Sequence, residues 1–111
     1  MGQLQNYKIR LTSDARDDIA QMKRYILETF GYRETAEAFS KNIKEAVRKL
    51  SPFSKAYTKT GIWIQGMEVY YKPYRTYLIF FVVEEDTVIV IRVLKERMYW
   101  QSIIRRVRFI K

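Results

Sequence analysis

Apolar residues recur at helical spacing in the first part of the chain. They follow one another at steps of four, three and four, with charged side chains mostly elsewhere, which predicts an amphipathic helix from about Asp14 to Phe30. Thr12, Ser13 and Asp14 offer N-cap side chains, and Gly31 follows the last turn as a C-cap. The stripe consists of Ala15, Ile19, Met22 and Ile26.

A second apolar stripe with the same spacing begins a few residues later and ends before Ser51-Pro52, where proline disfavours further helix. Only two to four residues join the two predicted helices, so we expect an antiparallel helical hairpin. Both stripes then need an apolar cover, for which a sheet is the obvious candidate. The second stripe consists of Ala36, Phe39, Ile43, Val47 and Leu50.

Extended segments account for most of the remaining chain. Tyr7 to Leu11 alternates between apolar and polar side chains, which predicts a strand. Residues 74–83 are apolar on both faces, as in a central strand, and a polar turn at 84–87 connects them to a strand at 88–94. The other predicted elements are a polar loop at 53–61, extended segments at 62–64 and 67–72 with Gly66 as a bend or bulge, and a short helix at about 98–106 in which Trp100 anchors the tail to the sheet.

The predicted order is β-α-α-β-β-β with a C-terminal helix or tail, which is an α+β fold in one domain spanning residues 1–111. A twisted, mainly antiparallel sheet would pack one face against the helical hairpin. We expect the other face to be partly open.

The composition of the chain excludes several kinds of catalytic and metal site and indicates the charge of its partners. The net charge is +9, from 21 Lys and Arg against 12 Asp and Glu, and it favours a polyanionic or strongly acidic partner. Cysteine and histidine are both absent, which excludes zinc–thiolate sites, Ser-His-Asp triads and imidazole bases. We expect no metal and no other cofactor. The longest apolar run, 77–83, is too short to span a bilayer, so we expect a cytoplasmic protein without a membrane partner.

Two stretches carry a family resemblance. Residues 77–100 read YLIFFVVEEDTVIVIRVLKERMYW and residues 11–19 read LTSDARDDI. Together with the element order, they resemble the RelE/ParE toxins of bacterial type II toxin–antitoxin systems. Lys95 stands where many members have histidine, and Leu78 stands where an arginine often follows the strand tyrosine, although Arg75 lies three residues earlier. Some members cleave messenger RNA on the ribosome, whereas ParE-type members poison DNA gyrase.

The resemblance and the cationic strand end give candidate catalytic residues Lys95, Arg97, Tyr99 and Arg75. Attack of a ribose 2′-OH on the adjacent phosphate requires positioning and charge stabilisation but no metal. Arg97 would hold the phosphate, Lys95 would supply a point charge, and Tyr99 would stack on a base or donate a proton. Without histidine, the general base would be Lys95 itself, Glu96 or Glu68.

Further cations are candidates for RNA binding. The segment 95–111 has six basic residues against one acid, with aromatic residues interleaved, a pattern typical of single-stranded RNA sites and of surfaces that an acidic antitoxin covers. A solvated loop or an amphipathic tail packed on the sheet explains the same residues. The candidates are Lys55, Lys59, Lys72, Arg105 and Arg106.

Three functions remain open at this point. The first is a metal-independent, ribosome-dependent mRNA endonuclease, with the ribosome and mRNA as partners. The second is a ParE-like gyrase poison without nuclease activity, and the third is a non-toxic homologue that binds only an antitoxin. In each case the resemblance implies a small cognate antitoxin with an acidic segment, whose complex sets the oligomeric state.

Overall fold

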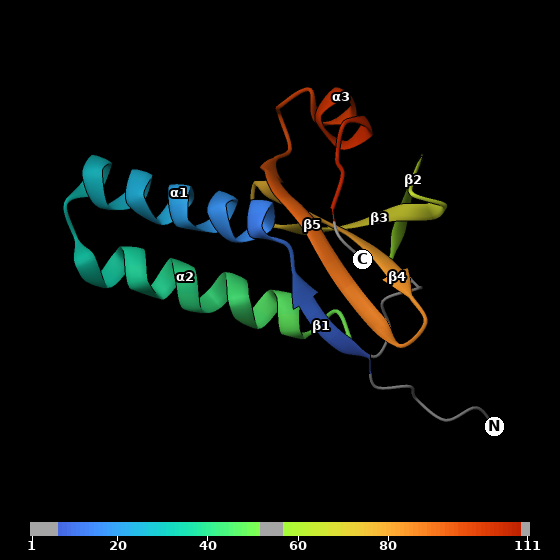
Figure 1. Cartoon of the computed structure of the whole chain (residues 1–111). Coiled ribbons are helices and arrows are strands. Elements are labelled where there is room, and N and C mark those ends of the chain that lie inside the picture. Colours follow the sequence, from blue (N-terminus) through green and yellow to red (C-terminus); the bar gives the residue numbers. More distant parts are fainter. Residues whose placement is uncertain (1–6, 52–56, 110–111) are drawn as a thin grey trace.

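The computed structural model describes residues 7–51 and 57–109 and arranges them as a five-stranded sheet with helices on both faces (Figure 1). The sheet has the order β1-β5-β4-β3-β2. The predicted α+β architecture is confirmed, and the element order differs from β-α-α-β-β-β only in that four strands, β2 to β5, follow the helical hairpin. The elements are β1 (Lys8–Leu11), α1 (Ser13–Phe30), α2 (Arg33–Arg48), β2 (Thr58–Ile64), β3 (Met67–Tyr74), β4 (Tyr77–Glu84), β5 (Thr87–Lys95) and α3 (Trp100–Arg105).

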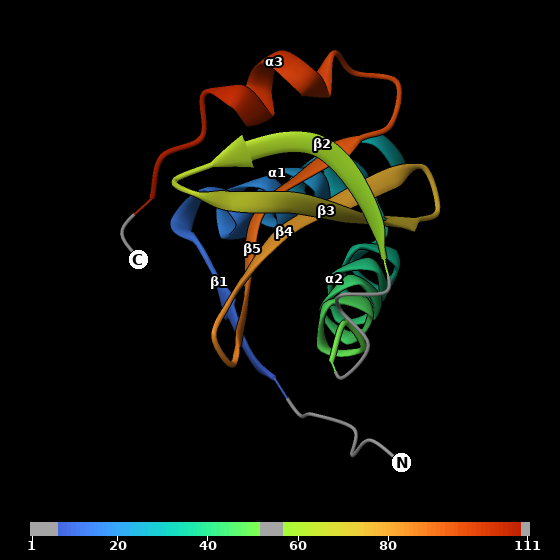
Figure 2. The ribbon, with the colours of Figure 1, turned by 90° about the vertical axis from the view of Figure 1, so that its right-hand side faces the viewer.

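The sheet is antiparallel except at one edge. Strands β2 to β5 follow one another as antiparallel neighbours, whereas β1 lies parallel to β5 and pairs only with its first half, Thr87 to Val90. The helical hairpin α1–α2 covers one face of the sheet and α3 covers the other (Figure 2). Beyond Val90, one side of β5 therefore lies next to α1 instead of a strand.

The first helix begins and ends at the predicted capping residues. The Thr12 hydroxyl accepts a hydrogen bond of 3.2 Å from the backbone N–H of Ala15. At the other end, Gly31 adopts φ 74°, a conformation that only glycine adopts without strain, and its N–H donates to the Leu27 carbonyl. Only Gly31 and Tyr32 separate the helices, which confirms the tight hairpin.

Two turns differ from the prediction. The predicted strand 74–83 is wrong at its start, because β3 continues through Tyr74 and a two-residue turn at 75–76 separates it from β4. Arg75 has φ 55° there, as a tight hairpin requires. The predicted loop 53–61 is wrong at its end, because β2 begins at Thr58. Gly66 forms the bend between β2 and β3, as one of the two predicted alternatives, and a separate register shift lies between Lys59 and Trp63, where Gly61 has φ 80°.

Both faces of the sheet carry a buried core. The hairpin side buries Ile19, Ile43, Phe81 and their neighbours. The opposite face buries a second cluster under α3 and the segment after it, so it is less open than predicted. Trp100 packs there as expected, with its ring centroid 5.0 Å from that of Phe80. Within the described part of the chain, the helices are too short or too polar to cross a membrane.

Candidate partner-binding groove

Asp18 links α1 to the part of β5 that does not pair with β1. Its carboxylate accepts hydrogen bonds from Arg92 Nε (2.7 Å), Arg92 Nη2 (2.9 Å) and the backbone N–H of Val93 (2.9 Å). Only 9% of Asp18 is exposed. The hydrogen bond that Arg92 donates to Asp18 raises the pKa of Arg92, and the cost of burial partly offsets this rise. The pair therefore fixes the position of α1 relative to the end of β5.

Asp18 and Arg92 both lie in the stretches that carry the family resemblance, but their pairing is not evident from the sequence. Asp18 lies on the apolar stripe of α1, between Ala15 and Ile19, and Arg92 is the one charged residue in the apolar run 88–94. A charge in an apolar pattern requires a buried partner. The presence of two such charges of opposite sign is the sequence feature that could have predicted this ion pair. The pair connects the two stretches that carry the family resemblance.

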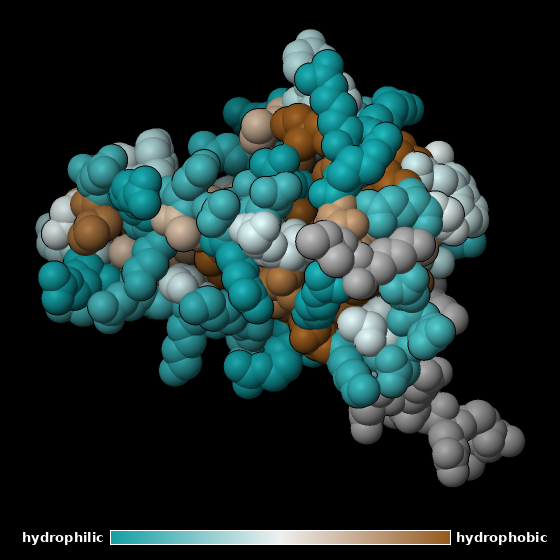
Figure 3. Space-filling model, viewed as in Figure 1, coloured by the Kyte–Doolittle hydropathy of each residue, from teal (hydrophilic) through white to brown (hydrophobic). Residues whose placement is uncertain are grey.

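The hairpin extends past the end of the sheet, so its last turns overhang the strand ends (Figure 1). Large side chains are exposed on this overhang, including Tyr25 (54%), Phe30 (58%) and Tyr32 (65%). Figure 3 shows hydrophobic residues at this projecting end of the molecule. Two adjoining hollows lie between the overhang and the strand ends.

The first hollow has a volume of about 340 Å³ and lies between α1 and the end of β5. Tyr77, at the start of β4, forms part of its wall. Burial raises the pKa of the Tyr77 phenol above its usual value of 10.0, and the nearby Tyr25 adds to the rise. The residues of the described chain that line this hollow are Asp18, Gln21, Met22, Tyr25, Tyr77, Arg92, Val93, Leu94, Lys95 and Met98.

The second hollow has a volume of about 470 Å³ and lies between the two helices and the β3–β4 turn. Its wall residue Phe39 stacks edge-to-face on Tyr77 of the first hollow at 5.5 Å. The two linings have no residue in common, but this ring contact connects them, and we refer to the two hollows together as the hairpin groove. The second hollow is lined by Ile26, Phe30, Glu34, Thr35, Ala38, Phe39, Asn42, Tyr74 and Arg75.

Two of the four predicted catalytic residues lie on the rim of the hairpin groove. Lys95 ends β5, opposite Tyr77, and its ammonium lies 5.1 Å from the ring centroid of Tyr25. Arg75 occupies the β3–β4 turn, with its guanidinium 5.7 Å from the Tyr74 ring. Two cations therefore lie on the rim, each against a tyrosine ring, and the acidic Glu34 lines the second hollow.

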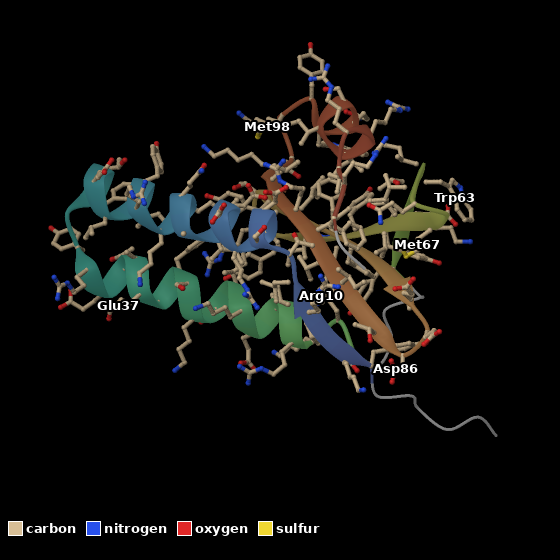
Figure 4. All side chains as sticks on the ribbon, in the orientation of Figure 1. Arg10, Glu37, Trp63, Met67, Asp86 and Met98 are labelled. Carbon is tan, nitrogen blue, oxygen red and sulfur yellow. The ribbon has the colours of Figure 1, made fainter. Side chains whose placement is uncertain are left out.

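The other two predicted catalytic residues lie in the connection between β5 and α3. Arg97 is exposed, and Tyr99 is 88% exposed just before the helix begins. Met98 between them lines the first hollow, and Figure 4 shows it at this connection. Arg97 and Tyr99 line neither hollow of the groove.

The predicted RNA-binding residues do not form one cluster. Lys59 on β2 lies 4.0 Å from the Glu68 carboxylate, and the Lys72 ammonium lies 5.4 Å from the Tyr57 ring on the hairpin side of the sheet. Arg105 and Arg106 lie at the end of α3, on the opposite side. Lys55 lies outside the described residues. A role in RNA binding stays a prediction for all five.

The residues of the hairpin groove suit a binding site better than a catalytic site. In the described ranges, no group of three or more His, Cys, Asp or Glu side chains is placed to hold a metal ion. Of the predicted bases, Glu68 is engaged with Lys59 on β2–β3 and Glu96 is exposed beyond the end of β5. An apolar groove with a cationic rim fits a protein segment that presents apolar and acidic side chains.

Comparison with known proteins places the chain in a family. Residues 9–100 match the family model described as ParE toxin of type II toxin-antitoxin system, parDE. Among solved structures, a chain described as the chromosomal ParDE TA system from P. aeruginosa superposes with a TM-score of 0.65 at 16% sequence identity, covering 80% of this chain and 95% of that chain. No curated protein matches significantly. Because the family match spans most of the chain, this protein belongs to the ParE toxin family of type II toxin–antitoxin systems.

Proposed function

We propose that this protein is a toxin that poisons DNA gyrase by binding it through the hairpin groove, without cutting RNA. Membership of the ParE family favours a gyrase poison over an mRNA endonuclease, because gyrase is the target that the resemblance implies for ParE-type members. Such a toxin acts in the cytoplasm, where gyrase acts on the chromosome.

The observation that carries this proposal is the uncovered aromatic surface of the overhang. Tyr25 and Phe30 are each more than half exposed, and both line the groove. Aromatic residues that fill or flank a pocket supply most of the binding energy at protein interfaces, and tyrosine and arginine are enriched there. Lys95 and Arg75 add two cations at the rim. The groove thus combines the features of a protein-binding site.

The placement of the predicted nuclease residues also favours binding over catalysis. Lys95 and Arg75 lie on the groove rim, whereas Arg97 and Tyr99 line neither hollow. RNA cleavage requires a base, a phosphate-binding cation and a proton donor around one reacting phosphate. A gyrase poison requires only an interface, so a chain without histidine performs this function with the residues it has.

A cognate antitoxin would neutralise the toxin by occupying the same groove. We expect an acidic segment whose carboxylates meet Lys95 and Arg75 while apolar side chains fill the hollows. Opposite charges speed the association of such partners, and this effect weakens as salt screens the charges. Antitoxin binding should therefore be slower in 0.5 M salt than in 0.1 M salt.

The test is to add the purified protein to two separate reactions. In a gyrase supercoiling reaction, we expect inhibited supercoiling and an accumulation of cleaved DNA held by gyrase. In a translation reaction with a reporter transcript, we expect intact RNA. Transcripts cut within codons, together with unaffected gyrase, would establish the endonuclease instead. Normal growth after induction of the protein alone would favour the non-toxic homologue.

A further inference from the structure

A second charged surface lies where α1 begins, and it meets the first hollow of the hairpin groove at Arg92. Four exposed arginines from β1, α1 and the segment after α3 surround two polar hollows of about 460 Å³ and 350 Å³. The hollows share Asp14 and Arg108 in their linings and therefore adjoin. Figure 4 shows one of the four, Arg10, on the face turned toward the viewer. We call this surface the arginine face; it consists of Arg10, Arg16, Arg106 and Arg108.

Few acidic side chains lie beside the arginines of this face in the described residues. Asp14 is the only acidic residue that lines either hollow in the described chain. No carboxylate of the described residues lies within 4.0 Å of the Arg16 or Arg106 guanidinium. Arg92, which also lines one hollow, is already held by Asp18. A cluster of exposed guanidinium groups creates a positive potential that attracts polyanions.

The orientation of one arginine is fixed by the backbone. Arg108 Nη1 donates to the carbonyl oxygens of Val107 (2.7 Å) and Arg105 (3.3 Å). The next residue, Phe109, donates its backbone N–H to the Gln65 side chain at 2.9 Å. The segment after α3 is thereby tied to the sheet, and its arginines are held beside α1.

We propose that the arginine face binds the phosphate backbone of duplex DNA. Guanidinium groups bind phosphate oxygens in a bidentate manner, and protein–DNA interfaces are polar and strongly positive. The one aromatic residue among the lining residues, Phe109, packs against the core under α3, so it is not available for stacking on bases. We therefore expect the arginine face to contact only the phosphate backbone of the DNA, and such binding does not depend on the DNA sequence.

An acidic protein segment fits this face less well than it fits the groove. A stable protein interface needs an apolar centre, which the hairpin groove offers through Met22, Tyr25 and Phe30. The arginine face is lined mainly by charged and hydroxyl residues, and Figure 3 shows hydrophilic side chains over much of this side of the molecule. The two surfaces meet at Arg92, which lines a hollow of each, and extend from there toward opposite ends of α1. DNA binding thus goes beyond the proposed gyrase contact and is measured without gyrase.

The experiment compares two double variants of equal net charge. Arg16→Gln with Arg106→Gln removes two cations of the arginine face, whereas Arg33→Gln with Lys41→Gln removes two exposed cations of α2. Binding to a 20-base-pair duplex of mixed sequence is followed by fluorescence anisotropy over a range of salt concentrations. We expect the first variant to bind about tenfold more weakly, and the dependence of log K on log salt to fall by about 1.8, which is about 0.9 for each lost phosphate contact. The second variant should retain its affinity within about twofold.

Equal losses in the two variants would overturn the proposal, because they would indicate a diffuse effect of net charge. A second measurement on the unaltered protein does not depend on folding of a variant. Duplex DNA should protect Arg16 and Arg106 from an arginine-selective dicarbonyl reagent, read by mass spectrometry, while Arg33 and Arg48 stay reactive. Protection of all four to the same extent, or of none, would also overturn it.

Discussion

The two ends of the α1–α2 hairpin both carry large apolar or aromatic side chains but differ in what covers them. Near the sheet, the stripe is buried, with Ile19 4% exposed and Ile43 0% exposed. Past the strand ends, the same helices expose Tyr25 (54%) and Phe30 (58%). Large aromatic side chains therefore continue along the hairpin beyond the surface that its apolar stripes pack against.

This difference separates residues that stabilise the fold from residues available to a partner. Burial of an aliphatic side chain contributes about 1.5–3 kcal/mol to folding, whereas a side chain that stays largely exposed contributes little. The large apolar side chains of the overhang stay exposed to water and therefore contribute little to folding. The stability of the fold does not explain why they are there. The comparison leads us to assign the near end to folding and the far end to binding.

The largest expected effect is at the near end. Ile43→Ala should lower the free energy of unfolding by about 3–4 kcal/mol, because it removes a fully buried side chain and leaves a cavity between α2 and the sheet. Urea denaturation followed by circular dichroism measures this change. A loss below about 1 kcal/mol would mean that the hairpin is not held by this core.

A slightly smaller effect is expected at the link between α1 and β5. Asp18→Ala should cost about 2–3 kcal/mol, because it leaves the half-buried Arg92 and the backbone N–H of Val93 without their acceptor. Denaturation of this variant and of Asp17→Ala, whose carboxylate is exposed on the same helix, gives a matched comparison. Equal stabilities of the two variants would contradict the role of Asp18.

At the far end, the expected change in stability is small and the change in function is large. Tyr25→Ser with Phe30→Ser should alter the free energy of unfolding by less than about 1 kcal/mol, because both side chains are mainly exposed. Induction of this variant in cells should no longer arrest growth. Trp63→Ser is the control, since Trp63 is 62% exposed but lies on β2, far from the overhang (Figure 4), and it should stay toxic.

The smallest effect concerns pH. Burial raises the pKa of Tyr77 above that of an unfolded tyrosine, near 10, so the unfolded chain loses this proton first as pH rises. The stability associated with neutral Tyr77 is therefore fully present below pH 10 and falls as pH rises above it. Tyr77→Phe should make stability fall less steeply between pH 9.5 and 11. An unchanged slope would show that the phenol is solvated in the groove.

The helices could be predicted from the sequence because their signals are local. Apolar residues at steps of three and four, Thr12 as N-cap and Gly31 as C-cap define α1 without reference to the rest of the fold. The β3–β4 turn could not be placed, because Arg75 takes the positive φ that glycine or asparagine usually signals. The start of β2 was missed because Thr58 and Lys59 lie on an exposed edge strand and lack an apolar pattern.

The candidate sites were harder to predict because they depend on how distant segments meet. Lys95 was placed at a strand end from the sequence, but its contact with Tyr25 requires the overhang of α1 past β5. The arginine face combines Arg10 and Arg16 with Arg106, about ninety residues later in the chain. Neither arrangement follows from periodicity, which describes one element at a time.

The central claim is that the overhang of the hairpin contacts gyrase. The most direct test is to titrate purified gyrase with the toxin and its variants in a supercoiling reaction. We expect the Tyr25→Ser, Phe30→Ser variant to need at least about thirtyfold more protein than the unaltered toxin for half-inhibition, equivalent to about 2 kcal/mol of lost binding energy. Trp63→Ser should inhibit like the unaltered toxin. Equal inhibition by all three proteins would contradict the claim.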